Sequence, residues 1–333
     1  MAAFKSFKGF NVQSFASDPV QTSAWTTGGA MNTGRNNAAG MGTATAAWAG
    51  GGANSPTGYT NKGEEYNGTS WTEVTNLPTA TSYFACAGSQ TAGLFFGGTP
   101  GVLSQCFKYD GTTFTSSGSL ATATKQCGGT GIQTLALCMG GEVPAITTIT
   151  QEFDGSTWAG GGAMSQARNN CPAFGVQADA VVVGGSAAHA PGTWIAETYN
   201  GTGWTTGGEL NTGREQMANP GAGTASTAGM VASGGSPTIS GTFSNEAESY
   251  NGSTWTVKSA TLSTKRMGAF GTRAPTTSYL VTGGTPGYLA STETYSENSE
   301  PNTFVEEGQL WYNSTSSVLK FFDGSTIKTI TTS

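Results

Sequence analysis

Few residues of this chain have side chains that could perform acid–base or nucleophilic chemistry. His189 is the single histidine, and the glutamates recur at regular intervals. These glutamates are Glu65, Glu152, Glu197, Glu248 and Glu293. A hydrolase needs carboxylates that converge on a substrate, or a nucleophile that lies beside a base. Because the glutamates follow the rhythm of a repeated unit, they indicate a structural role, and we predict no catalytic residue and no enzyme activity.

Four arginines also recur, each in a polar stretch that precedes an apolar one. They are Arg35, Arg168, Arg214 and Arg266. They could form a ring of ligand-binding groups, or they could hydrogen-bond backbone carbonyls and the recurring glutamates. We favour the second, structural role.

Charge and composition exclude several classes of function. The chain has 14 basic and 20 acidic residues, whereas phosphate binding needs a concentrated Lys/Arg footprint, so we expect no nucleic-acid partner. No segment approaches the roughly 20 apolar residues of a membrane span, and the N-terminus lacks an apolar run of signal-peptide length. We therefore expect a soluble protein that is made in the cytosol and not inserted in a membrane.

The cysteines indicate neither disulfides nor a metal site. Cys86, Cys106, Cys127, Cys138 and Cys171 are odd in number, lie in the first half of the chain and contain no Cys-x-x-Cys pair. We expect reduced, mostly buried thiols, and neither a metal ion nor a cofactor.

A repeated pattern supplies the elements that must position these residues. An aromatic residue, Asn or Asp, and Gly are followed three residues later by Trp or Phe, at intervals of 43, 44, 46 and 51 residues. The five copies are Tyr66-Asn67-Gly68 with Trp71, Tyr109-Asp110-Gly111 with Phe114, Phe153-Asp154-Gly155 with Trp158, Tyr199-Asn200-Gly201 with Trp204, and Tyr250-Asn251-Gly252 with Trp255. An apolar run that ends in two glycines precedes each copy, and a sixth such run follows the fifth copy. These pairs are at Gly51, Gly97-Gly98, Gly140-Gly141, Gly184-Gly185, Gly234-Gly235 and Gly283-Gly284.

Each repeat predicts a meander of four antiparallel strands. The run before the glycines is a buried second strand, the aromatic residue lies on the third, and the Trp lies on the fourth. Asn-Gly and Asp-Gly tolerate positive φ and suit the turn between the third and fourth strands, so the Asp154-Gly155 string indicates a turn. Six double glycines predict an all-β fold, a six-bladed β-propeller over residues 22–300.

The two ends of the repeat array predict how the ring closes. Trp25 occupies a fourth-strand position with no third strand before it, whereas the sixth double glycine is followed by a third strand, residues 291–295, without its Trp. We predict that the strand of Trp25 completes the sixth blade, because joining the ends in one blade hides both edges.

The order of double glycine, Tyr and Trp resembles the kelch repeat over residues 22–296. Strings such as ETYNGTGW and AMNTGRN look like kelch-type propellers of tailed bacteriophages of marine bacteria, and residues 306–330 are similar to a Gly-x-Leu-Trp-Tyr-Asn hairpin module of virion proteins. Phe114 departs from the pattern, as do the second and third blades, which lack the arginine. Kelch propellers include copper-radical oxidases, which need at least two histidine ligands, and this chain has only His189.

Loops between second and third strands share one face of a propeller and here differ in length, as recognition loops on a rigid scaffold do. Exposed aromatic side chains can stack on sugars or anchor protein contacts. The candidate binding residues on this loop face are Tyr59, His189, Trp194 and Tyr288, and the alternative for Trp194 is that it packs inward.

We expect three segments: an N-terminal docking arm (1–21) with four phenylalanines, the propeller (22–300), and a C-terminal β-hairpin attachment module (301–333). The resemblance implies a structural protein of a phage virion, a tail fibre or host-recognition component. Its expected partners are other virion proteins, bound through the two terminal segments, and a host surface glycan or protein; a homo-oligomer is also open. The alternatives are a capsid-associated or tail decoration protein and a glycan-degrading enzyme.

Overall fold

The structure is a computed structural model of the 333-residue chain. It describes residues 13–15, 22–55, 58–186, 194–218, 226–236, 241–272, 277–298, 310–313, 318–322 and 327–330. The chain divides into two compact units, one made of Ala24–Ser296 and the other of Met1–Ser23 together with Glu297–Ser333. No helix long and apolar enough to cross a membrane occurs in the described ranges.

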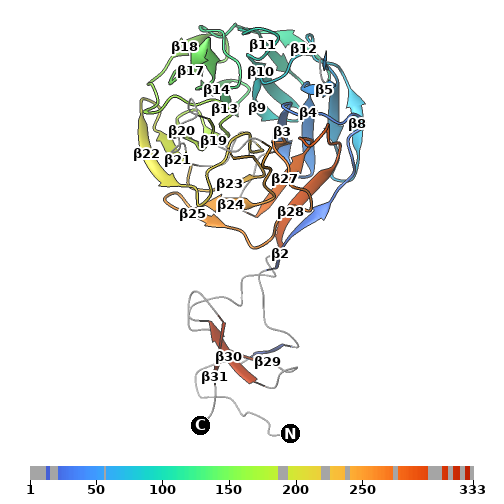
Figure 1. Cartoon of the computed structure of the whole chain (residues 1–333), viewed down its shortest axis with the longest axis vertical. Coiled ribbons are helices and arrows are strands. Elements are labelled where there is room, and N and C mark those ends of the chain that lie inside the picture. The colour runs from blue at the N-terminus through green and yellow to red at the C-terminus, as the bar shows by residue number, and fades with distance from the viewer. Residues whose placement is uncertain are drawn as a thin grey trace. The chain divides into compact units, whose positions relative to one another are not determined.

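The larger unit is a ring of six antiparallel sheets, which confirms the predicted six-bladed β-propeller (Figure 1). The first blade contains β3 (Ala39–Thr43), β4 (Ala46–Gly50), β7 (Gly63–Tyr66) and β8 (Trp71–Val74). The second contains β9 (Ala85–Ser89), β10 (Ala92–Phe96), β11 (Cys106–Tyr109) and β12 (Phe114–Ser116). The third contains β13 (Gly128–Ile132), β14 (Leu135–Met139), β17 (Thr150–Phe153) and β18 (Trp158–Gly160).

The fourth blade contains β19 (Ala173–Val176), β20 (Asp179–Val182), β21 (Ile195–Tyr199) and β22 (Trp204–Glu209). The fifth contains β23 (Gly229–Ala232), β24 (Ala247–Tyr250) and β25 (Trp255–Val257), and a bridge from Ala218 to Ala232 marks its innermost segment. Two of the loops between second and third strands form small hairpins of their own, β5 (Ala53–Ser55) with β6 (Gly58–Tyr59) and β15 (Glu142–Val143) with β16 (Ala145–Ile146).

The sixth blade joins the two ends of the propeller. It contains β26 (Phe270–Gly271), β27 (Ser278–Thr282) and β28 (Thr292–Asn298), and β2 (Thr22–Thr27) is its outermost strand. The rings of Trp25 and Tyr295 lie 5.4 Å apart, close to the spacing of the Tyr–Trp pairs in the other blades. The predicted closure by the strand of Trp25 is therefore confirmed.

Aromatic pairs on the two outer strands build the contact between blades. In every blade the third-strand aromatic ring packs on the fourth-strand ring at 4.6–5.4 Å. The described residues form six buried clusters, one between each pair of neighbouring blades, in which these rings meet the apolar second strands. Large rings at the rim and small residues near the axis give each blade the wedge shape that a closed ring requires.

The turns between third and fourth strands are stabilised by the Asn or Asp of the repeat. The Oδ1 atom of Asp154 accepts hydrogen bonds from the backbone N–H groups of Ser156 and Thr157, at 2.8 and 2.7 Å, and Gly155 has a φ of 97°. Asn67, Asp110, Asn200 and Asn251 make the same bonds. These donors lower the pKa of Asp154 and of Asp110 well below the usual range. The Asp154-Gly155 string is therefore a turn, as predicted.

The smaller unit contains a four-stranded sheet in the order β1 (Gln13–Phe15), β29 (Leu310–Asn313), β30 (Val318–Phe322) and β31 (Ile327–Ile330). β1 pairs with β29 in parallel, and the other strands are antiparallel. Residues of both predicted terminal segments therefore share one sheet. Phe4, Phe7 and Phe10 of the docking arm lie outside the described residues.

Candidate functional site

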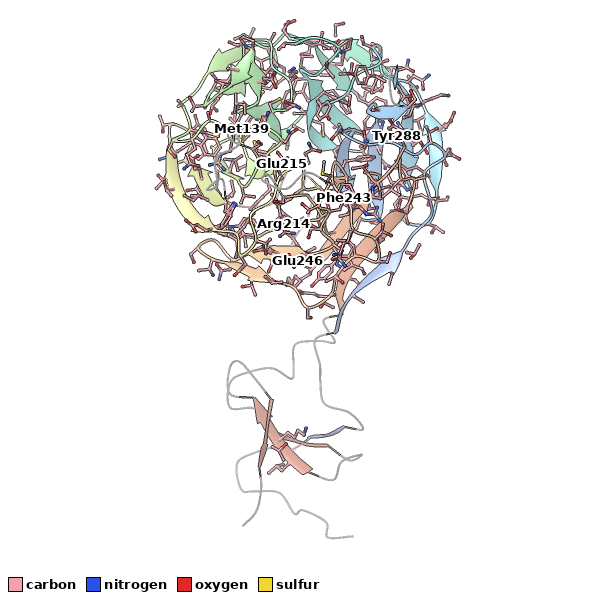
Figure 2. All side chains as sticks on the ribbon, in the orientation of Figure 1. Met139, Arg214, Glu215, Phe243, Glu246 and Tyr288 are labelled. Carbon is pink, nitrogen blue, oxygen red and sulfur yellow. The ribbon has the colours of Figure 1, made fainter. Side chains whose placement is uncertain are left out.

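The recurring arginines are buried and serve their own blades. The Nη2 atom of Arg168 lies 2.7 Å from Glu197 Oε1, both side chains are fully buried, and Nη1 donates to the carbonyls of Gly184 and Ile195. The same arrangement occurs in Arg35–Glu64, Arg214–Glu248 and Arg266–Glu293. Figure 2 shows Arg214 beside Glu246, whose carbonyl it binds at 2.9 Å. Each guanidinium group thus connects the segment before the first strand to the third strand of the same blade. This is a structural role and not a ring of ligand-binding groups.

The two blades without an arginine replace the ion pair by neutral groups. In the third blade, Gln151 Nε2 donates to the carbonyl of Thr122 at 3.0 Å and to the hydroxyl of Thr124 at 3.4 Å. In the second blade, Gln105 Nε2 donates to the hydroxyl of Thr81 at 2.9 Å. The third blade thus carries a neutral pair at the arginine and glutamate positions, whereas Gln105 of the second blade lies two residues before the glutamate position.

The five recurring glutamates all lie on third strands, where they occupy two positions. Glu197, Glu248 and Glu293 face arginines of their own blades, and in the first blade that place belongs to Glu64. Glu65 and Glu152 instead accept hydrogen bonds from the hydroxyls of Tyr109 and Tyr199 in the neighbouring blades. Burial and the bond to Glu152 raise the pKa of Tyr199 to about 12. Both sets are structural.

The double-glycine position of the fifth blade differs by one residue from the pair Gly234-Gly235 that the repeat pattern predicts. Arg214 binds the carbonyl of Ser233, as the other arginines bind the first glycine of each pair, and Ser233 has the matching φ of 63°. The structural pair is thus Ser233 and Gly234. Gly235 instead bridges Glu215, as Ala53 bridges Asn36 in the first blade.

Tyr59, Trp194 and Tyr288 of the loop face lie on separate loops. Tyr59 on β6 is 41% exposed and Trp194 before β21 is 38% exposed, so both aromatic rings are partly available to a ligand. Tyr288 is half-buried, and its carbonyl lies against Gly34. His189 lies outside the described residues.

Trp194 rests on a glycine of the following blade. A Cβ atom added at Gly213 would come within 1.6 Å of Trp194 Nε1. The exposed ring is therefore held against Gly213 on one side, so that its other side is open. This arrangement lies between the two alternatives for Trp194, because the ring neither projects freely nor packs inside.

We expect Gly213→Ala to displace the Trp194 ring and to increase the fraction of tryptophan fluorescence that acrylamide quenches. The added methyl group cannot be accommodated unless the indole moves. A Trp194→Phe variant identifies the contribution of this ring to the signal. Gly160→Ala is the matched control, because nothing lies within 4 Å of a Cβ there. Equal quenching of the Gly213→Ala variant and the unaltered protein would contradict the contact.

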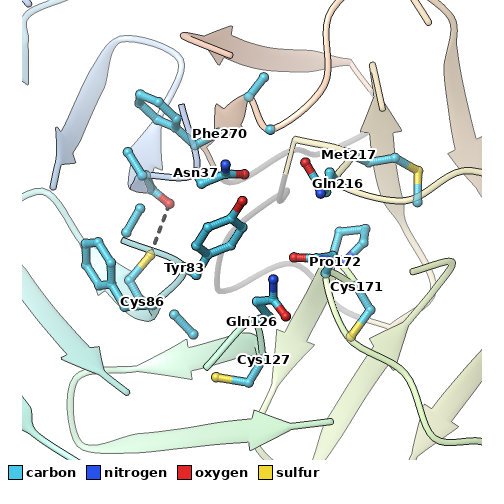
Figure 3. Close-up of a pocket in the computed structure, with 18 residues that line it drawn as sticks. Asn37, Tyr83, Cys86, Gln126, Cys127, Cys171, Pro172, Gln216, Met217 and Phe270 are labelled. Carbon is cyan, nitrogen blue, oxygen red and sulfur yellow. Dashed lines mark hydrogen bonds between the residues drawn. The ribbon is translucent and has the colours of Figure 1, made fainter. Parts of the chain in front are cut away.

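A second site, which we did not predict from the sequence, lies on the propeller axis. Six residues, one before the first strand of each blade, form a closed ring in which each backbone N–H donates to the carbonyl of the preceding member at 2.8–3.1 Å. We call Asn37, Tyr83, Gln126, Asn170, Gln216 and Gly268 the axial ring. Figure 3 shows the side chains of Asn37, Tyr83, Gln126 and Gln216 pointing toward one another. They line a cavity of about 90 Å³.

The axial ring lies close to the loop face. Burial raises the pKa of Tyr83, and the nearby Tyr59 and Glu215 raise it further. Tyr59 is thus the loop-face aromatic residue that the structure brings near the axis. The sequence did contain a signal for the ring, because Asn37, Asn170 and Gln216 each follow a recurring arginine by two residues.

Three cysteines, Cys86, Cys127 and Cys171, line the axial cavity, and burial makes the thiols of Cys86 and Cys171 poor nucleophiles. Burial raises the pKa of Cys86 and of Cys171 to about 12, and Cys86 Sγ donates to the carbonyl of Gly40 at 3.2 Å. The sulfur atoms of Cys127 and Cys171 point away from the axis (Figure 3). The described residues include no group of three or more His, Cys, Asp or Glu side chains that could hold a metal ion.

Comparison with known proteins adds no relative to this architecture. No protein-family model matches the sequence, and no curated protein matches it.

Proposed function

We propose that this chain is a non-catalytic binding module of a tailed-phage virion, a tail-fibre or host-recognition component built on a kelch-type propeller. The observation that carries the proposal is the placement of Tyr59 and Trp194. Both are exposed on loops between second and third strands, and these loops share one face because second strands run in the same direction in every blade. Exposed aromatic residues on a rigid scaffold are suited to glycan or protein contacts.

The internal use of the recurring charges supports a binding role over catalysis. The four buried arginines and their glutamates satisfy one another within the blades. Catalytic carboxylates must be free to exchange protons with a substrate. None of these paired groups is available for that purpose, so the glycan-degrading alternative has no support among these four carboxylates.

The kelch-type and virion assignments rest on sequence resemblance. The repeat of double glycine, Tyr and Trp supports the first, and the Leu310-Trp311-Tyr312-Asn313 string supports the second. In the structure this string forms β29, which pairs with β1 and β30. We infer that the smaller unit attaches the protein to other virion proteins.

A decoration protein of the capsid or tail is the second candidate, because the opposite face of the propeller carries exposed apolar residues. Ile132, Leu135 and Val176 lie on the first–second hairpins of the third and fourth blades and are 41–48% exposed. Ile132 and Leu135 lie side by side in their hairpin, and exposed apolar residues that lie together are typical of protein contacts. A decoration protein would cover this face against the particle.

Immunogold labelling of intact particles with an antibody to the propeller, followed by electron microscopy, tests the proposal. We expect label at the tail tip or fibres. Label over the capsid would favour decoration, and particles without label would exclude a virion protein. Trp194→Ala should weaken binding of the isolated protein to host cells, whereas Gly160→Ala should not.

A further inference from the structure

The axial ring keeps side chains where the backbone favours glycine. All six members have a positive φ between 49° and 62°. This left-handed conformation is strained for residues with a Cβ atom, tolerated by Asn, and worst for bulky side chains such as that of Tyr83. Elsewhere in the described chain the positive-φ positions are filled by glycine, with Ser233 as the exception. Five of the six ring positions are nevertheless not glycine.

The backbone of the ring does not require these side chains. Gly268 has the same φ as its neighbours, and its N–H and carbonyl take part in the same cycle of hydrogen bonds. Strained non-glycine residues that persist are typical of functional sites. The side chains of the ring therefore have a role beyond closing the propeller.

The side chains offer unused hydrogen-bonding groups. Gln126 Oε1 accepts from Asn169 Nδ2 at 3.0 Å, and Asn37 Nδ2 donates to Asn36 Oδ1 at 3.3 Å. Within the described part of the chain, the Gln216 amide and the Tyr83 hydroxyl have no side-chain hydrogen bond to protein. An amide both donates and accepts, and a phenol does the same. These half-buried groups point toward the axis (Figure 3).

The lining of the cavity is neutral. None of the residues that line it is charged at neutral pH: amides and Tyr83 form its rim, and Phe84, Phe270, Met217 and Pro172 contribute to its walls. Of the charged residues next to ring members, Lys125 is neutralised by Glu142 at 3.0 Å, whereas Glu215 is acidic and raises the pKa of Tyr83. An anionic ligand would lose its hydration without gaining an opposite charge. The cavity of about 90 Å³ has the volume of about three water molecules in the liquid, so it accommodates a small neutral group.

We propose that the axial ring binds one neutral sugar residue, whose hydroxyls replace water at the amides of Gln126, Asn170 and Gln216 and at the Tyr83 hydroxyl. A small exocyclic group of the sugar, such as a hydroxymethyl, enters the cavity. Tyr59, an exposed aromatic residue of the same loop face, would contact the rest of the saccharide. This inference rests on the proposed function in one respect: the sugar is taken to be part of a host-surface glycan.

Glycine substitution separates a ligand-binding role from a structural one. In Gln216→Gly the backbone keeps its φ without strain, as Gly268 does, so we expect an unchanged or higher melting temperature. The same variant removes one ligand-binding amide, so we expect an affinity for neutral sugar at least about tenfold weaker. Ser233→Gly is the matched control, because it relieves a positive φ outside the ring and should leave sugar affinity unchanged.

The probes are methyl glucoside, methyl galactoside and N-acetylglucosamine, with galacturonate as the charged comparison, measured on the full chain by saturation-transfer NMR and calorimetry. Binding of a neutral probe that Gln216→Gly weakens and Ser233→Gly preserves would support the proposal. It is overturned if no neutral probe binds, if galacturonate binds more tightly, or if Gln216→Gly preserves binding. A lower melting temperature of the Gln216→Gly variant would instead show that the Gln216 side chain stabilises the fold. The labelling of phage particles does not depend on sugar binding. Labelled particles together with a protein that binds no neutral sugar would therefore support the virion assignment and exclude the axial sugar site.

Discussion

Deletion of residues 1–27 is expected to lower the stability of the propeller by at least about 3 kcal/mol, in the range of removing one large buried aromatic residue. The deletion removes β2, the outermost strand of the sixth blade, and the Trp25 ring that packs on Tyr295 and Tyr279. It also exposes the edge of β28. The hydrophobic cluster between the fifth and sixth blades loses Trp25, which packs against it. Thermal unfolding followed by circular dichroism measures the effect.

Deletion of residues 1–21 is the control for this experiment, because it removes β1 but keeps β2. We expect the propeller of this variant to melt at the temperature of the full chain. A synthetic peptide of residues 22–31, added to the 1–27 deletion, should restore part of the lost stability. Equal melting of the two deletions would show that β2 does not close the ring.

Arg168→Met is expected to destabilise the propeller by about 3–5 kcal/mol, because it leaves the Glu197 carboxylate buried without a counterion. Glu197 is fully buried, and its other oxygen accepts a hydrogen bond from the backbone N–H of Ser165, at 2.7 Å. Two carbonyls, of Gly184 and Ile195, also lose their donor. Chemical denaturation gives the change in the free energy of unfolding.

The third blade supplies the matched control for this substitution. The double variant Arg168→Thr, Glu197→Gln reproduces its Thr124–Gln151 pair, which carries no charge. We expect the double variant to recover most of the stability that Arg168→Met loses, since a neutral pair has no uncompensated charge to desolvate. If the double variant is as unstable as the single one, the buried charge is not the main cause of the loss.

Local sequence determined the architecture of this protein because each blade carries its own signals. The Asn-Gly and Asp-Gly turns form bonds within four residues, and the buried second strands are recognisable by their continuous apolar runs. The incomplete units at Trp25 and at residues 291–295 could be assigned to one blade because an unpaired edge strand is unfavourable. The fold and its closure therefore follow from repeat spacing and turn chemistry.

Register was decided by tertiary structure. Side chains of neighbouring strand residues point to opposite faces, so a shift of one residue exchanges a contact within the blade for a contact with the next blade. Glu64 and Glu65 are both glutamate, yet one binds Arg35 and the other Tyr109 of the second blade. Sequence spacing alone does not distinguish adjacent identical residues.

The axial ring was likewise decided only by the closed fold. Its members come from six different blades, and they meet because each blade donates a backbone hydrogen bond to the one before it until Asn37 binds the carbonyl of Gly268. Their positive φ is not encoded in a local pattern, since Asn, Tyr and Gln do not by themselves indicate a left-handed backbone. The sequence by itself determined the blades and the order in which they close; the convergence of polar side chains on the axis arises from closure, because only a complete ring brings residues from all six blades to one point.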